Sequence, residues 1–177
     1  MKKFSKHWRY PLWLAVIILS VWWLFFGYKY GLIYNHGSSM EPTHSDGDIL
    51  IIEKTRFLGK HWKPDRTDVV VIRDEESGDN LTKRVIALEG ETVIIKNGYI
   101  YVNDKRIKDI WSNGNIIFYI EDEETRGKKP KHEWLFFNTN SQPTKVPRGS
   151  VWVIGDNRKI SWYGVLPIKE IKGLVVL

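Results

Sequence analysis

The hydrophobic pattern divides the chain into one long uncharged run and a series of short apolar runs. Residues 10–28 carry no charge, and apolar side chains occupy every face of a helix built from them. A helix of about 20 such residues crosses a bilayer core, and one that is apolar all round needs an apolar surrounding. We therefore predict a short basic tail at residues 1–9, a transmembrane anchor at residues 10–28 and one domain at residues 29–177.

The ends of the uncharged run also fit a membrane anchor. Trp8 and Trp13 lie near its start, and Trp23 and Tyr28 lie near its end, as in the aromatic belts of membrane interfaces. Large residues such as Phe26 stand where a cleavable signal peptide needs small ones, so an uncleaved anchor is favoured over a signal peptide. Basic residues are more numerous before the run than after it, which predicts a cytoplasmic N-terminus and an extracytoplasmic domain.

The remainder of the chain has the pattern of a β-protein. Asn97-Gly98 separates two β-branched runs, and this pair is a strong signal for a hairpin because both residues tolerate positive φ. A charged stretch at residues 121–131 predicts a solvated loop. Many short strands with frequent turns indicate a mainly β domain of sandwich or barrel-like form. The predicted strands lie at residues 48–53, 68–72, 81–88, 92–96, 99–102, 116–120, 134–137, 151–154 and 174–177.

The net charge of +6 lies almost wholly near the N-terminus. Five basic residues and no acid fall within residues 1–29, which leaves +1 for the rest of the chain. The folded domain is thus nearly neutral, so nucleic acid is not expected as a partner. The chain has no cysteine, which excludes disulfides and thiolate metal sites. The five residues are Lys2, Lys3, Lys6, Arg9 and Lys29.

Three polar segments are candidates for chemistry. Taken singly, each fits an ordinary turn or strand. They occur in a fixed order behind the anchor, which is what makes them informative together. They are Gly37-Ser38-Ser39-Met40-Glu41-Pro42-Thr43, then Thr82-Lys83-Arg84-Val85-Ile86, then Gly155-Asp156-Asn157-Arg158 with Ser161.

In order and spacing, these segments resemble the motifs of the bacterial type I signal peptidases. The resemblance implies a serine endopeptidase at the cell membrane that removes signal peptides from secretory preproteins after small residues. It implies Ser39 as the nucleophile and Lys83 as the general base, without a cofactor or a metal. It also implies support from Ser161, Asp156 and Arg158, with the Ser161 hydroxyl bonded to the lysine amine.

Such a serine–lysine pair makes a physical demand on its surroundings. A serine hydroxyl is a weak nucleophile until a base removes its proton. A lysine amine has an ordinary pKa of about 10.4 and must be lowered to roughly 7–8 to serve near neutrality. Burial disfavours the ammonium form, and the apolar neighbours Leu81, Val85 and Ile86 could provide it. The resemblance implies that the Ser39 N–H holds the oxyanion. In some relatives a hydroxyl two positions before the nucleophile is the second donor, but this chain has Gly37 at that position, which leaves the second donor unassigned.

For the substrate site, the resemblance indicates only the positions in the chain at which pocket residues are expected. It suggests that shallow pocket walls form at Ile33, Met40, Leu81 and Thr82. The expected partners are secretory preproteins and the lipid bilayer.

The third segment departs from the family pattern. Ser161 is followed by Trp162-Tyr163-Gly164, where relatives commonly continue with x-Asp-Ser-Arg-x-x-Gly. Either Asp156 and Arg158, with the aromatic pair, replace the missing charge pair, or catalysis is impaired. The second case leaves an alternative function, a membrane-tethered β-domain that binds signal sequences or a partner without cleaving them.

Other readings have less support. A serine–histidine–aspartate hydrolase could draw on the histidines, with Asp48, Asp68 or Asp156 to orient one of them, but the chain has no G-x-S-x-G elbow. The same histidines lack metal-ligand spacing. The self-cleaving transcriptional repressors also use serine and lysine, but this chain has an anchor and no helical DNA-binding domain. The histidines considered are His36, His44, His61 and His132.

Overall fold

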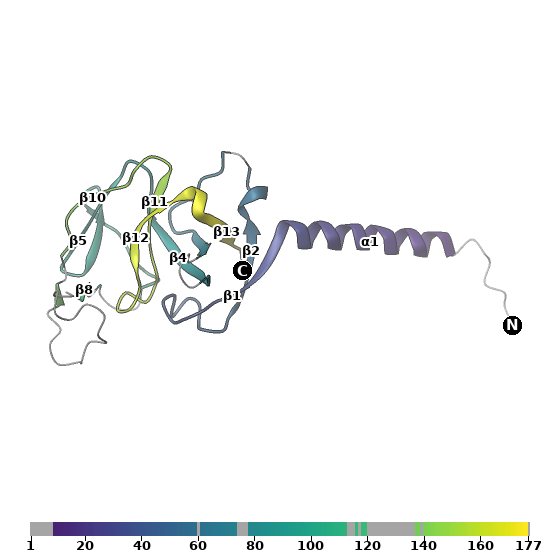
Figure 1. Cartoon of the computed structure of the whole chain (residues 1–177), viewed down its shortest axis with the longest axis horizontal. Coiled ribbons are helices and arrows are strands. Elements are labelled where there is room, and N and C mark those ends of the chain that lie inside the picture. Colours follow the sequence, from purple (N-terminus) through teal and green to yellow (C-terminus); the bar gives the residue numbers. More distant parts are fainter. Residues whose placement is uncertain are drawn as a thin grey trace.

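A single long helix precedes the β-domain. The computed structural model describes residues 9–59, 61–73, 78–112, 116, 118–119, 137–138 and 140–176. Helix α1 (Arg9–Lys29) has 21 residues, which at 1.5 Å per residue gives a length of about 31 Å, enough to cross a bilayer core. It projects from the domain (Figure 1). Its apolar side chains are uncovered, with Trp23 72% exposed. The helix confirms that the uncharged run is helical and long and apolar enough to cross a membrane, as an anchor requires. Residues 1–8 and the predicted loop at 121–131 lie outside the described residues.

Within the described residues, the strands form sheets of seven, four and two strands. The large sheet has the order β1-β2-β13-β3-β4-β11-β12, and the smaller ones are β10-β5-β6-β7 and β8-β9. All described strand pairs are antiparallel. The strands are β1 (Tyr30–Tyr34), β2 (Ile49–Lys54), β3 (Val69–Arg73), β4 (Asn80–Ala87), β5 (Thr92–Lys96), β6 (Tyr99–Val102), β7 (Lys105–Arg106), β8 (Phe118–Tyr119), β9 (Phe137–Asn138), β10 (Thr144–Lys145), β11 (Ser150–Ile154), β12 (Tyr163–Pro167) and β13 (Ile171–Val175), with 3-10 turns η2 (Thr55–Phe57) and η3 (Ile168–Glu170).

Two apolar clusters lie on opposite faces of the large sheet. Alternation along β11 sends Val151 and Val153 into one cluster and Trp152 and Ile154 into the other. The first cluster joins side chains of β3, β4, β11 and β13, and the second joins β4 and β11 to the inner face of β5 and β6. Central strands are therefore buried on both faces, which agrees with the predicted mainly β domain of sandwich or barrel-like form.

Most predicted strands are confirmed, and four were missed: β1, β12 and the two-residue strands β7 and β10. The β5–β6 hairpin turns at Asn97 and Gly98, both with positive φ as predicted. Strand β1 was missed because its short YGLIY sequence is half exposed and contains a glycine. Strand β12 was missed because it contains Gly164 and Pro167, residues that edge strands tolerate. The strands predicted at residues 116–120 and 134–137 lie largely outside the described residues, although β8 and β9 pair there.

Candidate active site

Ser39 lies in the loop of residues 35–48 that joins the paired strands β1 and β2. Backbone bonds close this loop at its neck, where the Asn35 N–H donates to the Asp48 carbonyl at 2.8 Å and the Gly47 N–H donates to the Asn35 carbonyl at 2.9 Å. The buried Asn35 amide also donates to the Ser45 carbonyl at 2.8 Å. The predicted nucleophile is thus held at the end of a hairpin, between the first two strands rather than ahead of the first.

Lys83 reaches this loop from β4. Its Nζ lies 2.8 Å from the Ser39 Oγ, which is hydrogen-bond distance. The residue is only 2% exposed. It pairs across the sheet with Val70 and shares a face of β4 with Val85, and both valines are fully buried. Burial lowers the pKa of the Lys83 amine to about 8, against the smaller opposing influence of Asp156.

The turn after β11 packs directly against the Ser39 loop. The Asn157 N–H donates to the Ser39 carbonyl at 3.0 Å, and the Asn157 side-chain amide donates to the Ser38 carbonyl at 3.1 Å. Gly155 lies so close that a side chain there would collide with the Ser39 carbonyl oxygen and the Ser161 Oγ. Only glycine allows this approach, so the turn and the loop are held in contact.

Asp156 forms a buried ion pair with Arg84, the residue after Lys83 on β4. The Arg84 Nε donates to Oδ1 at 2.8 Å and its Nη2 donates to Oδ2 at 2.6 Å. The Thr43 hydroxyl donates to the same carboxylate at 2.5 Å. Because Thr43, Arg84 and Asp156 belong to three different segments, this ion pair joins all three predicted motifs at one point.

Arg158 also lies inside the site, with a side chain only 1% exposed. Its Nη1 donates to the Gly155 carbonyl and lies 3.9 Å from Asp156 Oδ1. Its main charge partner is Asp109, a residue from outside the predicted motifs.

Ser161 differs from its predicted role in the bonds it makes. Its Oγ accepts a hydrogen bond from the Gly155 N–H at 2.6 Å and donates to the Trp162 carbonyl at 2.9 Å. The hydroxyl is thus bonded to backbone groups of the turn in this structure, and no hydrogen bond is found between it and the amine of Lys83 among the described residues. Its bond to the Gly155 N–H holds the residue that packs on Ser39.

Comparisons with known proteins show the family of this chain. A family model described as "Signal peptidase, peptidase S26" matches residues 6–177. The chain belongs to the signal peptidase family. It is 29% identical to signal peptidase I of Streptococcus pneumoniae over 97% of this chain and 91% of that protein. It is 32% identical to signal peptidase I U of Bacillus subtilis over 82% of this chain and 68% of that protein. A crystal structure of a signal peptidase I from Enterococcus faecalis matches 65% of this chain and 98% of its own, at 25% identity and a TM-score of 0.40.

The four predicted pocket walls do not have equal access to a substrate. Met40 is fully buried and Thr82 is 2% exposed, so neither side chain offers open surface in this structure. Ile33 and Leu81 are partly exposed. The buried Thr82 hydroxyl has no hydrogen-bond partner within the part of the chain that the structure describes. A substrate side chain could therefore touch Ile33 or Leu81, while contact with Met40 would require movement of the loop.

Four residues at the site were not assigned a role from the sequence. Thr43, Arg84 and Asn157 lie within the three motifs, so their membership of those motifs could have indicated that they belong to the site. Asp109 lies 49 residues from Arg158 in the variable part of the chain, and nothing local marks it. The predicted aromatic replacement is only partly found, since Trp162 is 52% exposed while the Tyr163 ring packs 5.4 Å from Trp152.

The alternatives based on histidine find no support in the described residues. There, no histidine is hydrogen-bonded to Ser39, and no group of His, Asp and Glu is arranged to hold a metal ion. His44 lies on the Ser39 loop, and burial together with the nearby Arg84 lowers its pKa. His132 lies outside the described residues.

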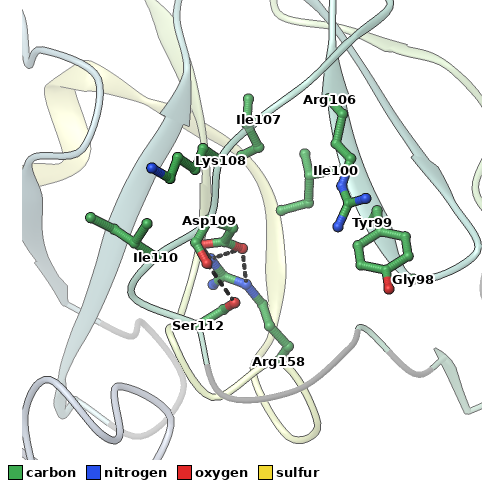
Figure 2. A pocket seen from close by; sticks show the side chains of 10 residues that line it. All are labelled: Gly98, Tyr99, Ile100, Arg106, Ile107, Lys108, Asp109, Ile110, Ser112 and Arg158. Carbon is green, nitrogen blue, oxygen red and sulfur yellow. Dashed lines mark hydrogen bonds and ion pairs between the residues drawn. The ribbon is translucent and has the colours of Figure 1, made fainter.

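A cavity of about 420 Å³ is lined by residues that include Asp109 and Arg158. Figure 2 shows Asp109 and Arg158 bonded to each other in its wall, with Arg106 and Tyr99 opposite. The cavity does not include Ser39 or Lys83. It marks the side from which Asp109 remains partly open to solvent.

Proposed function

We propose that this protein is a membrane-bound serine endopeptidase that removes signal peptides from exported preproteins, with Ser39 as nucleophile and Lys83 as general base. The single observation that carries the proposal is the 2.8 Å separation between the Ser39 hydroxyl and a buried lysine amine. The family assignment supports the reaction class and a preprotein substrate.

The proposed reaction begins with proton transfer from Ser39 to the neutral Lys83 amine. The Ser39 Oγ then attacks the scissile carbonyl, and the backbone N–H of Ser39 stabilises the oxyanion. Collapse of this intermediate breaks the peptide bond, and the Lys83 ammonium returns its proton to the leaving amine. Lys83, neutral again, takes a proton from water, which attacks the ester on Ser39. The ester bond breaks, Lys83 returns the proton to the Ser39 oxygen, and the signal peptide leaves with a free carboxylate.

The strand that carries Lys83 offers a place for an extended substrate. Strand β4 pairs with β3 from Asn80 to Arg84, but its pairing with β11 begins only at Arg84. The backbone groups of Val85 bond to the β3 side, so by alternation those of Thr82 face the side that β11 leaves uncovered. A preprotein segment could add to this edge as a strand, which would bring a peptide bond near Lys83.

The burial of the four predicted pocket walls supports selection for small residues. Met40 and Thr82 are buried, while Leu81 and Ile33 are partly exposed. A site with apolar walls and little depth would accept alanine and exclude large side chains. We therefore expect small residues at the first and third positions before the cleaved bond.

The anchor supports a substrate that is itself held in a membrane. Helix α1 is apolar and long enough to cross a bilayer, and β1 follows it without a linker. Confinement of the enzyme and the preprotein to one surface raises their effective concentration. The catalytic domain would then lie on the extracytoplasmic face with the basic tail inside.

The alternative of a tethered domain that binds without cleaving is not favoured. It depended on loss of the charge pair after Ser161. In this structure the buried charges of Asp156 and Arg158 have partners in Arg84 and Asp109. The proposed nucleophile and base are also in contact.

The test is cleavage of a preprotein by the full-length protein in detergent micelles or vesicles. We expect Ser39→Ala and Lys83→Ala each to lower kcat by at least about a thousandfold. Lys145→Ala, which removes an exposed lysine on β10, is the matched control and should leave the rate unchanged. Mass spectrometry of the products should locate the cut after a small residue. Equal cleavage by wild type and both active-site variants would refute the assignment.

A further inference from the structure

Two arginines and two aspartates form a set of ion pairs with no net charge next to the strand that carries Lys83. One of the four residues lies outside the three motifs. Arg84 and Arg158 contribute two positive charges, and Asp156 and Asp109 contribute two negative charges. Their side chains are 6%, 1%, 0% and 19% exposed. Buried charges are stable only when each is paired, so the carboxylate of Asp109 is part of what allows Arg158 to lie inside the domain.

Asp109 is the principal partner of Arg158. Three contacts of 2.6–2.9 Å join the Nε and Nη2 atoms of Arg158 to the two oxygens of Asp109 (Figure 2). Asp156 lies farther from Arg158, at 3.9 Å, and its two oxygens are already bonded to Arg84. A two-point contact between a planar guanidinium and a carboxylate fixes orientation as well as charge.

The fixed orientation of Arg158 has a consequence for the turn that supports Ser39. The Nη1 of Arg158 donates to the Gly155 carbonyl, and Gly155 lies against the Ser39 carbonyl. The Asn157 N–H, two residues further along the turn, also donates to the Ser39 carbonyl. Asp109 is therefore connected to Ser39 through the side chain of Arg158 and the turn of residues 155–157.

The segment that supplies Asp109 also covers the second arginine. The Trp111 ring lies 4.8 Å from the Arg84 guanidinium carbon, within the range of a cation–π interaction. The Ser112 hydroxyl donates to the Asp109 carbonyl at 3.1 Å, which shapes the segment. Both arginines that flank Asp156 are thus held by residues 109–112.

We propose that Asp109 is a positioning residue of the peptidase site, which acts through Arg158 to hold the 155–157 turn against Ser39 and to balance the charge behind Lys83. It takes the place of the charged residues that would follow Ser161 in the motif this chain shortens. The inference rests on the proposed function.

The charge balance gives a readout that a merely structural residue would not produce. Asp156 favours the ammonium form of Lys83, whereas burial disfavours it. The other charged or titratable groups near Asp156 are Arg84, Arg158 and His44. The His44 imidazole interacts electrostatically with both Arg84 and Asp156. Removal of the negative charge of Asp109 leaves a net positive set, so Lys83 should lose its proton at a lower pH.

The experiment compares full-length wild type, Asp109→Asn and Asp109→Glu for preprotein cleavage across a pH series, with Ser39→Ala as the zero-activity baseline. For Asp109→Asn we expect kcat to fall by about tenfold to a hundredfold, with little change in KM. We also expect the acid limb of the pH profile to move to lower pH. Asp109→Glu keeps the charge and should leave the limb at its wild-type position. Asp104→Asn, an exposed neutralisation in the β6–β7 turn, is the matched control and should match wild type.

Two results would overturn the inference while leaving the proposed function intact. One is an active wild type with an Asp109→Asn variant of equal kcat and unchanged pH profile. The other is a limb that moves to higher pH, which would show entry of water around Lys83. If Asp109→Asn does not fold, the double variant Asp109→Asn/Arg158→Gln, which removes both charges, decides: reduced kcat at unchanged KM supports positioning, and wild-type kcat refutes it. Absence of cleavage by wild type would instead contradict the proposed function itself.

Discussion

The Lys83 amine is subject to two opposing influences. Its removal from water lowers the pKa, and the Asp156 carboxylate raises it, with burial the larger effect. The difference between the ordinary value and about 8 corresponds to about 3 kcal/mol. A lysine in this environment is a neutral base over a usable pH range, which an exposed lysine on the same strand would not be.

The pH dependence of cleavage follows from this pKa. Because the base must be unprotonated, kcat/KM should rise with pH and level off above about pH 8. Lys83→Arg, which stays protonated, should be inactive throughout the range. A profile that instead bends in the ordinary histidine range, and that changes in His44→Asn, would contradict lysine as the base.

The lowered pKa of Lys83 should also make the free energy of unfolding depend on pH in a defined direction. Below pH 8 both the folded and unfolded states hold the Lys83 proton, while between about 8 and 10.5 only the unfolded state does. The unfolded state then binds more protons, so stability rises with pH across this window. Lys83→Met should therefore unfold at a higher temperature than wild type at pH 7, and the difference should shrink as pH approaches 10.5. A difference that does not vary with pH would show that Lys83 keeps its ordinary pKa.

Gly155 is the residue whose size the site tolerates least. A methyl group at this position would overlap a backbone oxygen of Ser39, which cannot rotate away, as well as the Ser161 hydroxyl. We expect Gly155→Ala to lower kcat by about a hundredfold, because displacement of the loop by about 1 Å is enough for such a loss. Gly27→Ala is the control, since that position has open space around it. Near-normal activity of Gly155→Ala would show that the turn and the loop do not need this contact.

At the scale of elements, the joint between α1 and the domain is fixed by cations. The last carbonyls of a helix lack partners within the helix. Here Lys54 Nζ lies 3.1 Å from the Gly27 carbonyl and 3.3 Å from the Tyr28 carbonyl. Arg56 donates to the Tyr28 carbonyl at 3.3 Å and packs over the Tyr28 ring at 4.5 Å. The helix therefore ends on β2 and η2 rather than on a free linker, which would set the height of Ser39 above a bilayer.

Loss of this joint should affect membrane-held substrates selectively. We expect the double variant Lys54→Ala/Arg56→Ala to cleave a vesicle-embedded preprotein about tenfold more slowly. Cleavage of a short soluble peptide with the same bond should be unchanged, because the Ser39–Lys83 pair is untouched. Lys169→Ala, an exposed cation on η3, serves as the control. Equal losses on both substrates would indicate damage to the domain rather than to the joint.

At the scale of the whole molecule, the basic tail and the nearly neutral domain lie at opposite ends of the predicted anchor. Four basic residues and no acid lie in the tail, and the domain beyond the helix is nearly neutral. Basic residues are retained on the cytoplasmic side during insertion. The molecule should therefore have its tail inside and its catalytic domain outside.

The absence of native cysteine makes this orientation directly measurable. A single cysteine at Lys105→Cys, on exposed β7, should react with a membrane-impermeant maleimide in intact spheroplasts. One at Ser5→Cys, in the tail, should react only after lysis. The opposite labelling pattern would reverse the proposed topology.

The sequence by itself determined the features that depend on local composition. An uncharged run of helix length defines the anchor, β-branched runs between turn residues define most strands, and Asn97-Gly98 defines a hairpin. These signals are local, because side-chain periodicity and turn chemistry act over a few residues. Strands β1 and β12 escaped because glycine, proline or exposure weakened the same local signals.

Only the tertiary structure decided which distant residues meet. The contact between Ser39 and Lys83 spans 44 positions, and that between Arg84 and Asp156 spans 72. Asp109 reaches Arg158 because the segment after β7 folds back beside the turn after β11. Strand order and the paths of loops create such contacts, and neither is encoded in the periodicity of any single segment. For the same reason, the sequence could name a serine and a lysine, but it could not show which carboxylate balances the charge behind them.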